Sequence, residues 1–275
     1  MSDAREAGDI GAIAAEVFSL LGTGRQVTPF SSRLAGLDLE DAYRVTAGVR
    51  ALREKSGEVA RGRKIGFTNR TIWAEFGVYA PIWGYLYDRT VHDLENIGST
   101  FSLTGLAEPR IEPEIVFGLT AAPQVGMDAG QLLGCIGWVA QGYEIVQSVY
   151  PNWRFAPADT VAAFGMHGAL LIGPRRPLRG GEHAWAASLS TFEADLYRDG
   201  ELIDHGSARN VLDGPLFALR HLVEVLDKDA HNPPLTAGEI VTTGTLTQAP
   251  HIRAGEEWST RLTGVGLDGT SVRFT

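Results

Sequence analysis

Apolar residues recur at helical spacing in two stretches near the N-terminus. The first covers residues 5–22, which predicts an amphipathic helix. The second begins at Asp38, whose side chain can cap the free backbone amides of a helix, and ends at Gly57. Two helices are too few to enclose a core. We therefore expect residues 1–60 to form a small N-terminal helical lobe that packs on the rest of the chain.

From Lys64 onward, the pattern changes to short β-branched or aromatic runs separated by Gly, Pro and Asp. The Asp199-Gly200 pair between two alternating segments predicts a tight hairpin. We expect an α+β protein in which residues 61–275 form a larger domain, a curled, mixed β-sheet roll. Helical patterns interrupt the strands at about residues 69–77, 127–138 and 214–227.

Composition narrows the class of protein. The chain is 44% apolar and 21% charged, as is usual for a globular protein. Its net charge of -9 is spread along the chain without a run of Lys and Arg, which argues against a nucleic-acid partner. No stretch reaches the roughly 18 apolar residues of a membrane span, and the N-terminus lacks the features of a signal peptide. We expect a cytoplasmic protein without a membrane partner.

Three glutamates form a candidate metal site. Glu112 and Glu114 are two residues apart on an expected strand, so both carboxylates point to one face. Such a pair is either a solvated edge or a metal site, because neighbouring carboxylates repel unless a cation lies between them. Pro113 suits an irregular strand at a sheet edge or site rim. Glu144 adds a third acid within an apolar run, and three carboxylates without a His or Cys cluster suit Mg²⁺ or Mn²⁺.

Lys64 is a candidate acid/base group. A lone lysine is ordinarily a solvated cation. Beside a site of three carboxylates, a partly buried lysine is suited to proton transfer.

Six short motifs in a fixed order resemble a known family. They are KIGFT at 64–68, GVYAPIWG at 77–84, RIEPEI at 110–115, YEIVQS at 143–148, ADTVA at 158–162 and GEIVTTGTLT at 238–247. Their order and spacing over residues 39–274 resemble the 2-keto-4-pentenoate hydratase and 4-oxalocrotonate decarboxylase family of the fumarylacetoacetate hydrolase superfamily. The resemblance implies the superfamily's β-roll as the catalytic domain, a Mg²⁺ or Mn²⁺ site, a homo-oligomer, and a small-molecule 2-oxo acid or its dienol as substrate.

The resemblance also implies roles for individual residues. Glu112, Glu114 and Glu144 fall on the family's metal ligands, and Lys64 falls on its catalytic lysine. In hydration, a 2-hydroxy-2,4-dienoate is protonated at C5 and takes up water at C4. In decarboxylation, a similar dienolate forms when a remote carboxylate leaves as CO₂. The metal stabilises the dienolate in both, so the metal motif does not separate the two reactions.

The chain departs from the family's pattern at two places. Hydratases that resemble it carry Asp in a Pro-Asp-aromatic-Gly motif where this chain has Ile82, an apolar residue as in the decarboxylase pattern. After ADTVA, the usual polar stretch is replaced by residues 163–167. His167 either replaces the missing acid/base group or is an ordinary histidine held by backbone partners. Asp88 is a further candidate for that replacement, and Asp159 is either a helix cap or a partner of the site.

We assign five residues to the substrate pocket: Ile82, Trp83, Phe164, Met166 and Thr245. The apolar members predict a dry pocket, which stabilises an apolar or aromatic substrate tail by roughly 25 cal/mol per Å² buried. A second carboxylate would be desolvated there without an evident cation to meet it, since Lys and Arg are scarce in these motifs, although Arg70 and Arg154 could reach in.

Four functions remain. The leading one is a metal-dependent lyase of the hydratase type that acts on a small 2-oxo-enoate or 2-hydroxy-2,4-dienoate. A 4-oxalocrotonate-type decarboxylase, which Ile82 favours, comes second. An acylpyruvate C–C hydrolase comes third, because no His-Glu pair that could activate water is evident. A non-catalytic, metal-stabilised binding protein comes last, since the acid triad and Lys64 are all present.

Overall fold

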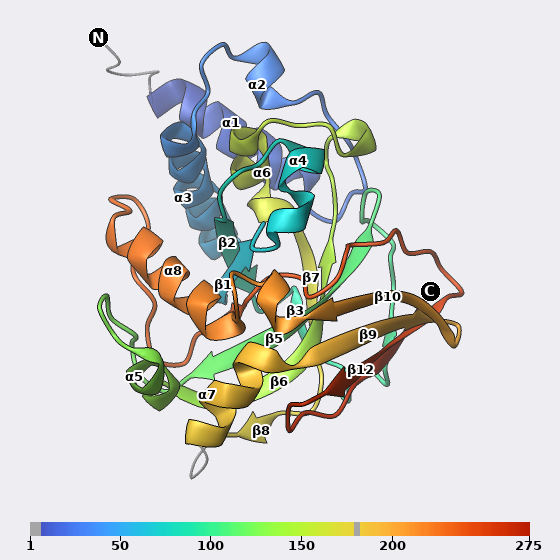
Figure 1. Cartoon of the computed structure of the whole chain (residues 1–275). Coiled ribbons are helices and arrows are strands. Elements are labelled where there is room, and N and C mark those ends of the chain that lie inside the picture. Colours follow the sequence, from blue (N-terminus) through green and yellow to red (C-terminus); the bar gives the residue numbers. More distant parts are fainter. Residues whose placement is uncertain (1–6, 179–181) are drawn as a thin grey trace.

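The computed structural model describes residues 7–178 and 182–275 (Figure 1). Its α-helices are α1 (Ala7–Leu20), α2 (Phe30–Arg33), α3 (Leu39–Lys55), α4 (Trp73–Phe76), α5 (Ala129–Gly134), α6 (Pro157–Ala162), α7 (Glu182–Thr191) and α8 (Pro215–Asp227). Four 3₁₀ turns are described: η1 (Arg70–Ile72), η2 (Pro151–Trp153), η3 (Phe164–Met166) and η4 (Ala208–Asn210). Within the described ranges, no helix is both long and apolar enough to cross a membrane.

The strands form two mixed sheets. The larger, eight-stranded sheet has the order β2-β1-β11-β5-β6-β7-β3, with β8 paired to β6, and the five-stranded sheet has the order β10-β9-β12-β13-β4. The strands are β1 (Ala60–Gly66), β2 (Ile82–Tyr87), β3 (Val91–Asp93), β4 (Thr100–Phe101), β5 (Arg110–Leu119), β6 (Ile136–Val146), β7 (His167–Ile172), β8 (Arg176–Pro177), β9 (Glu193–Arg198), β10 (Glu201–Ser207), β11 (Ile240–Thr242), β12 (Glu257–Thr263) and β13 (Ser271–Phe274). The predicted α+β fold with a mixed β-roll is confirmed.

The N-terminal helices pack together at one end of the molecule (Figure 1). Val17 of α1, Val45 of α3 and Val161 of α6 belong to one buried apolar cluster. Asp38 caps α3 by accepting a hydrogen bond from the Asp41 amide at 2.9 Å, as predicted. The first two residues of the predicted helix over 5–22 lie outside the described ranges. The boundary between lobe and roll after residue 60 stays a prediction.

Local sequence patterns predicted the hairpin well and several helices less well. Asp199 and Gly200 adopt φ of 49° and 83° between β9 and β10, as a tight primed turn requires. The helix expected over 127–138 ends at Gly134, because the residues from Ile136 onward pair with β5. The helix α7 was not predicted.

The faces of β5 and β6 have different environments. On one face, Ile111 of β5 and Tyr143 of β6 pack against the smaller sheet, in a cluster that includes Trp258 of β12. On the other face, Val116 and Ala140 form a small apolar cluster with neighbouring strands. The polar residues of β5 share this second face by strand alternation. One face of β5 is therefore packed against the core. A site can form on the other face, at the end of the strand that carries the glutamates.

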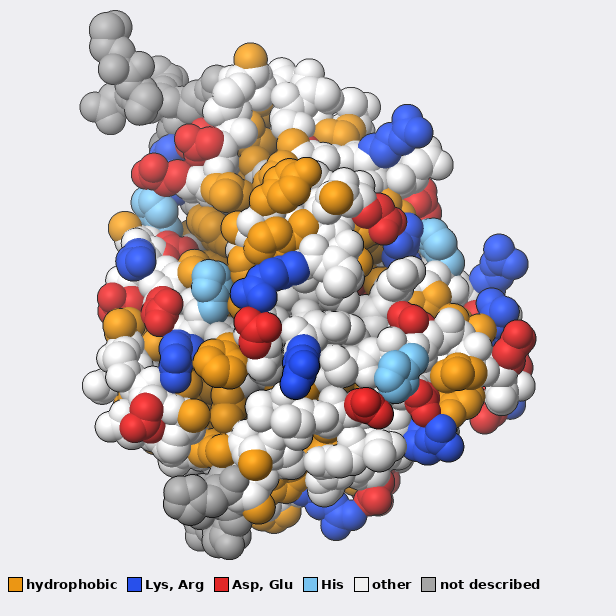
Figure 2. All heavy atoms as spheres, in the orientation of Figure 1, with side chains coloured by type: hydrophobic (Ala, Val, Ile, Leu, Met, Phe, Trp, Pro, Cys, Tyr) orange, Lys and Arg blue, Asp and Glu red, His pale blue; other side chains and the backbone are white. Residues whose placement is uncertain are grey.

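Charged side chains of both signs are interspersed over the face shown in Figure 2, between patches of hydrophobic side chains. No single sign of charge dominates that face.

Candidate metal and active site

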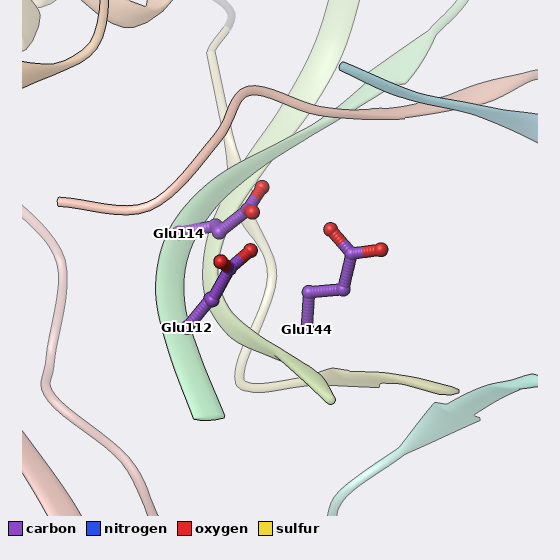
Figure 3. Close-up of side chains that lie close together, drawn as sticks. All are labelled: Glu112, Glu114 and Glu144. Atoms are coloured by element: carbon purple, nitrogen blue, oxygen red, sulfur yellow. The ribbon is translucent and has the colours of Figure 1, made fainter. Parts of the chain in front are cut away.

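Strand pairing brings the three predicted glutamates together. Glu112 and Glu114 lie on the same face of β5, and Glu112 is the direct cross-strand partner of Glu144 on β6. Figure 3 shows the three side chains pointing toward one another. Pro113 fits in this central strand because β11 pairs only with Val116–Gly118. Beside the proline runs the segment after β11, whose Leu246 amide donates a hydrogen bond of 2.9 Å to the Pro113 carbonyl, so no donor from Pro113 is needed there.

The triad fits a divalent cation. One carboxylate oxygen from each glutamate lies within 4.8 Å of the others, and Glu114 and Glu144 are fully buried. Glu114 Oε2 accepts a hydrogen bond from the Gly244 amide at 2.7 Å, while Glu114 Oε1 is buried without a hydrogen-bond partner. Burial, together with the neighbouring carboxylates, raises the pKa of Glu112 to about 7 and that of Glu114 well above its usual range. A hard cation with oxygen ligands would offset both the desolvation of these carboxylates and their mutual repulsion.

Lys64 lies at this site. Its Nζ is 3.2 Å from Glu144 Oε2 and donates a hydrogen bond to the Gly165 carbonyl at 2.9 Å. The residue is 3% exposed. Burial lowers the pKa of Lys64, but Glu144, Glu112 and Glu114 outweigh it and raise the pKa overall. Of the three donors of the ammonium, one is used by the Gly165 carbonyl, and Lys64 also lines the cavity.

Strained backbone presents the Gly165 carbonyl to Lys64. Phe164, Gly165 and Met166 have φ of 62°, 61° and 65° in η3. The left-handed conformation costs a non-glycine residue roughly 1–2 kcal/mol, so the surrounding packing must hold this turn in place. Gly84 permits the close approach, because a Cβ there would lie 2.6 Å from the Phe164 carbonyl oxygen.

His167 lies behind the triad rather than in the cavity wall. Its Nδ1 is 2.9 Å from Glu144 Oε1, and its Nε2 is 3.0 Å from the Thr90 hydroxyl. A register shift between β6 and β7 at Ile145 and Val146 pairs His167 with Val146 and turns its ring toward Glu144. These contacts orient a carboxylate. A catalytic role for His167 stays a prediction.

A cavity of about 410 Å³ opens beside the triad. Lys64, Glu112, Met166 and Thr245 are among the residues that line it. Its aromatic walls come from Phe67, Phe76 and Trp153, and its polar residues include Arg110, Gln248 and His251.

Three residues assigned to the pocket lie elsewhere. Ile82 and Phe164 are buried among the N-terminal helices and α6, and Trp83 is 1% exposed in the main core, stacked on Tyr43. These three side chains do not line this cavity, and their assignment to the substrate pocket stays a prediction. For Ile82 and Trp83, β2 is buried on both faces, so its sequence could not indicate which side faces the site. Asp88 accepts a hydrogen bond from the Val59 amide and does not line the cavity, so it does not replace the missing acid.

The prediction that Asp159 caps a helix is confirmed. Its carboxylate accepts hydrogen bonds from the Ala156 amide at 2.8 Å and from the Ser31 amide at 2.9 Å. Asp159 therefore ties α6 to α2.

Arg110 is a cavity residue that the sequence analysis missed. The alternation that pairs Glu112 with Glu114 also places Arg110 on the same face of β5, so the signal was present. Its guanidinium lies 4.5 Å from the centroid of the Trp153 ring. The expectation of a cavity without a cation for a second carboxylate is therefore wrong.

Comparison with solved structures defines the class of fold. A 4-oxalocrotonate decarboxylase from Pseudomonas putida G7, complexed with magnesium and adipate, superposes with a TM-score of 0.87 at 24% identity over 99% of each chain. A fumarylpyruvate hydrolase from Pseudomonas aeruginosa, in complex with Mn²⁺ and pyruvate, has a TM-score of 0.58 at 15% identity, covering 79% of this chain and 90% of the other. The fold is that of the fumarylacetoacetate hydrolase superfamily.

Curated relatives define the family. A 2-hydroxyhexa-2,4-dienoate hydratase from Comamonas testosteroni is 29% identical, covering 94% of this chain and 95% of the relative. A 4-oxalocrotonate decarboxylase from Pseudomonas sp. strain CF600 is 30% identical, covering 85% and 84%. No protein-family model matches the chain. The chain belongs to the 2-keto-4-pentenoate hydratase and 4-oxalocrotonate decarboxylase family, as its motifs indicated, and the enzymes of this family are lyases.

Proposed function

We propose that this protein is a divalent-metal-dependent lyase of the hydratase type that acts on a small 2-oxo-enoate or its 2-hydroxy-2,4-dienoate. The observation that carries the proposal is the convergence of Glu112, Glu114 and Glu144 beside Lys64, at a cavity that Lys64 and Glu112 line. The cavity, about 410 Å³, is of a size that suits a small organic acid. The names of the hydratase relatives support the reaction type.

The three glutamates would hold Mg²⁺ or Mn²⁺, because all the available donors are carboxylate oxygens. When bound, such a cation supplies Lewis-acid stabilisation of the negative charge that develops in a 2-oxo acid. His167 restrains the Glu144 carboxylate through Nδ1, so that Glu144 is oriented before the cation arrives.

Lys64 would hold and deliver a proton. Its Nζ lies 3.2 Å from Glu144 Oε2 and donates to the Gly165 carbonyl, and the ammonium has further N–H donors for a substrate in the cavity that Lys64 lines. Hydration of the dienoate needs a proton at C5 and a hydroxyl at C4, so the net reaction adds one water. Such positioned proton transfer contributes about 10²- to 10⁴-fold to a rate.

A decarboxylase is the second candidate. Ile82 replaces the Asp of the hydratase motif, and the relative from strain CF600, at 30% identity, is a 4-oxalocrotonate decarboxylase. A decarboxylase would need the same triad and Lys64, because it also passes through a dienolate.

One experiment separates these reactions. The purified protein is incubated with Mg²⁺ and either 2-hydroxypenta-2,4-dienoate or 2-oxohex-3-enedioate, while dienol absorbance and CO₂ are followed. We expect loss of dienol absorbance without CO₂. Release of CO₂ establishes the second candidate. No turnover of either substrate with Mg²⁺ or Mn²⁺, in a protein that still binds the cation, supports a binding protein and rejects both lyases.

The proposal includes a homo-oligomer in the cytoplasm that acts on a small molecule and has neither a nucleic-acid nor a membrane partner. The family resemblance supports the oligomer, and the scattered charge of the sequence supports the rest. Sedimentation of the purified protein and fractionation of cells test these two properties.

A further inference from the structure

We infer that His251 is the general base that activates water for addition at C4 of the substrate. The inference rests on the proposed function, since it assumes that a 2-oxo-enoate occupies the cavity. It deepens that function by assigning a second catalytic residue to the step that Lys64 does not perform.

The site described so far lacks a base for the water. The three glutamates are the ligands of the proposed cation. Burial lowers the pKa of Lys64, but the glutamates raise it overall, and the resulting ammonium donates a proton and cannot accept one. Ile82 replaces the Asp of the hydratase motif, and neither Asp88 nor His167 lines the cavity. A further group is therefore needed to take the proton that water releases.

Backbone hydrogen bonds fix the segment that carries His251 against the start of β5. The Ile111 amide donates a hydrogen bond of 3.1 Å to the Pro250 carbonyl. The Ile252 amide donates another, also of 3.1 Å, to the carbonyl of the residue before Arg110. His251 and Arg110 are the directly opposed pair between these two bonds. In such a pair the two side chains lie close together on one face.

That face is the one that carries the glutamates. Ile111 and Ile252 belong to the buried apolar cluster on the opposite face. By alternation, Arg110 and His251 therefore point to the face of Glu112, and both line the cavity. His251 lies at the level of Arg110, one two-residue step of about 6.6 Å along the strand from the level of Glu112. A substrate whose 2-oxo end lies at the triad directs C4 away from the triad, into the cavity that His251 lines.

The imidazole of His251 is free to act as a base. Among the histidines whose side chains the structure describes, the rings of His167 and His205 make hydrogen bonds within the chain, and that of His251 makes none. Burial and the Arg110 guanidinium lower the pKa of His251, Glu108 opposes them, and Arg253 acts with them. The ring is therefore neutral at neutral pH, with a lone pair that can accept a proton.

The other acidic side chains in the cavity wall are less suited to this role. Asp204 accepts hydrogen bonds from the backbone amides of His205 and Gln248, each at 2.9 Å. Glu75 is exposed on the four-residue helix α4. Neither residue pairs with β5, whereas His251 does. His251 is thus the base that the sheet itself holds beside the triad.

The step balances with His251 as the carrier of one proton. His251 takes a proton from water while the water oxygen forms a bond to C4. The electron pair of the C3=C4 double bond moves toward the 2-oxo group and gives an enolate with a C2=C3 double bond. The imidazolium then releases its proton and C3 gains one, which restores the ketone and the neutral imidazole. The net change is the addition of one water to the 2-oxo-enoate.

The test follows 2-hydroxypenta-2,4-dienoate with Mg²⁺ through two measured steps. Loss of dienol absorbance reports protonation at C5, which forms 2-oxopent-3-enoate, and chromatography reports the 4-hydroxy-2-oxopentanoate that hydration forms. In His251→Gln, we expect dienol loss within about threefold of the wild-type rate and hydration slowed about 10²-fold or more. The intermediate 2-oxopent-3-enoate should therefore accumulate. Lys64→Met should lose both steps.

His231→Gln is the matched control, because His231 is likewise exposed and does not line the cavity. It should keep both rates. The rise in Tm that Mg²⁺ produces checks that each variant is folded and binds the cation. If His251→Gln does not fold, the ratio of the two rates in His251→Asn decides the outcome.

The pH profile gives a readout that a purely structural role would not move. A general base works in its unprotonated form, so hydration by the wild-type protein should fall as the pH drops through the lowered pKa of His251. The charged groups that face the ring are Arg110, Arg253 and Glu108. In His251→Gln, this fall should be absent from the residual hydration rate, and a fall that persists unchanged overturns the inference.

The remaining outcomes separate the inference from the proposed function. Hydration at the wild-type rate in His251→Gln overturns the inference but leaves the proposed function standing. An equal loss of both steps also overturns it, because His251 would then act in substrate binding or in the first step. Accumulation of 2-oxopent-3-enoate in Glu75→Gln and not in His251→Gln assigns the base to Glu75. Failure of the wild-type protein to form 4-hydroxy-2-oxopentanoate rejects the proposed function as well.

Discussion

Replacing Lys64 by Met should separate its role in chemistry from its role in stability. Methionine keeps most of the side-chain volume but removes the ammonium, which lies 3.2 Å from Glu144 Oε2 and 2.9 Å from the Gly165 carbonyl oxygen. The variant should lose about 10²-fold or more in kcat, because the proton donor is gone. Lys55→Met, on the exposed end of α3, is the matched control and should retain full activity.

The effect of Lys64→Met on stability should depend on the cation. Without metal, Glu144 keeps its contact with His167 but loses its buried cationic partner, and breaking a buried ion pair costs about 3–5 kcal/mol. With Mg²⁺ bound, the carboxylates are compensated by the cation, and only the Gly165 carbonyl lacks a donor, which costs about 1 kcal/mol. At 2–4 °C per kcal/mol, Tm should fall by about 6–20 °C in EDTA and by about 2–4 °C in Mg²⁺.

Both losses in Tm are measured by thermal unfolding in EDTA and in saturating Mg²⁺. The wild-type protein, Lys64→Met and Lys55→Met are compared. The sequence analysis expected a partly buried lysine, and the nearly complete burial of Lys64 leads us to expect a contribution to folding in the metal-free protein as well. A Tm loss of equal size in EDTA and in Mg²⁺ would refute the electrostatic reasoning. Unchanged kcat would remove Lys64 from the mechanism.

Three further substitutions test other parts of the site. Glu114→Gln should abolish the rise in Tm that Mg²⁺ produces, and a rise of the wild-type size would contradict the metal assignment. His167→Asn should weaken Mg²⁺ binding about 10- to 100-fold in calorimetry, because Glu144 loses its restraint; unchanged affinity would leave His167 without this role. Gly84→Ala places a Cβ 2.6 Å from the Phe164 carbonyl oxygen and should lower both Tm and kcat. Wild-type values of Tm and kcat would show that the turn at Phe164–Met166 can shift without affecting stability or activity.

The metal site was predictable to the extent that it follows from strand alternation and from the cost of burying charge. Alternation placed Glu112 and Glu114 on one face, and the apolar run around Glu144 showed that this acid needed a partner. That the two segments meet depends on the register of β5 against β6, which pairs Glu112 with Glu144. Residue periodicity does not determine register, so the sequence assigned Glu144 to the site from the cost of its burial and from the family resemblance, without showing how the two segments meet.

The cavity was predicted less well because its lining is set by tertiary packing. Ile82 and Phe164 lie in motifs next to the site in sequence, yet both contribute to the helical core behind it. Arg110 shares the alternation of the two glutamates and was overlooked because it stands at the start of the strand. The face of a strand on which a residue lies therefore predicts whether it lines the cavity better than its closeness in sequence to a motif does.

The direct pairing of Glu112 with Glu144 has a consequence for how the chain reaches its native sheet. A slip of β5 by one residue would turn Glu112 and Glu114 to the face that Ile111 and Ile115 occupy, and the three carboxylates would no longer converge. A cation that binds the triad binds the native register and not the register slipped by one residue. Metal supply then widens the free-energy gap between the correct sheet and its misfolded alternatives, so the ion selects for correct folding as well as serving the reaction.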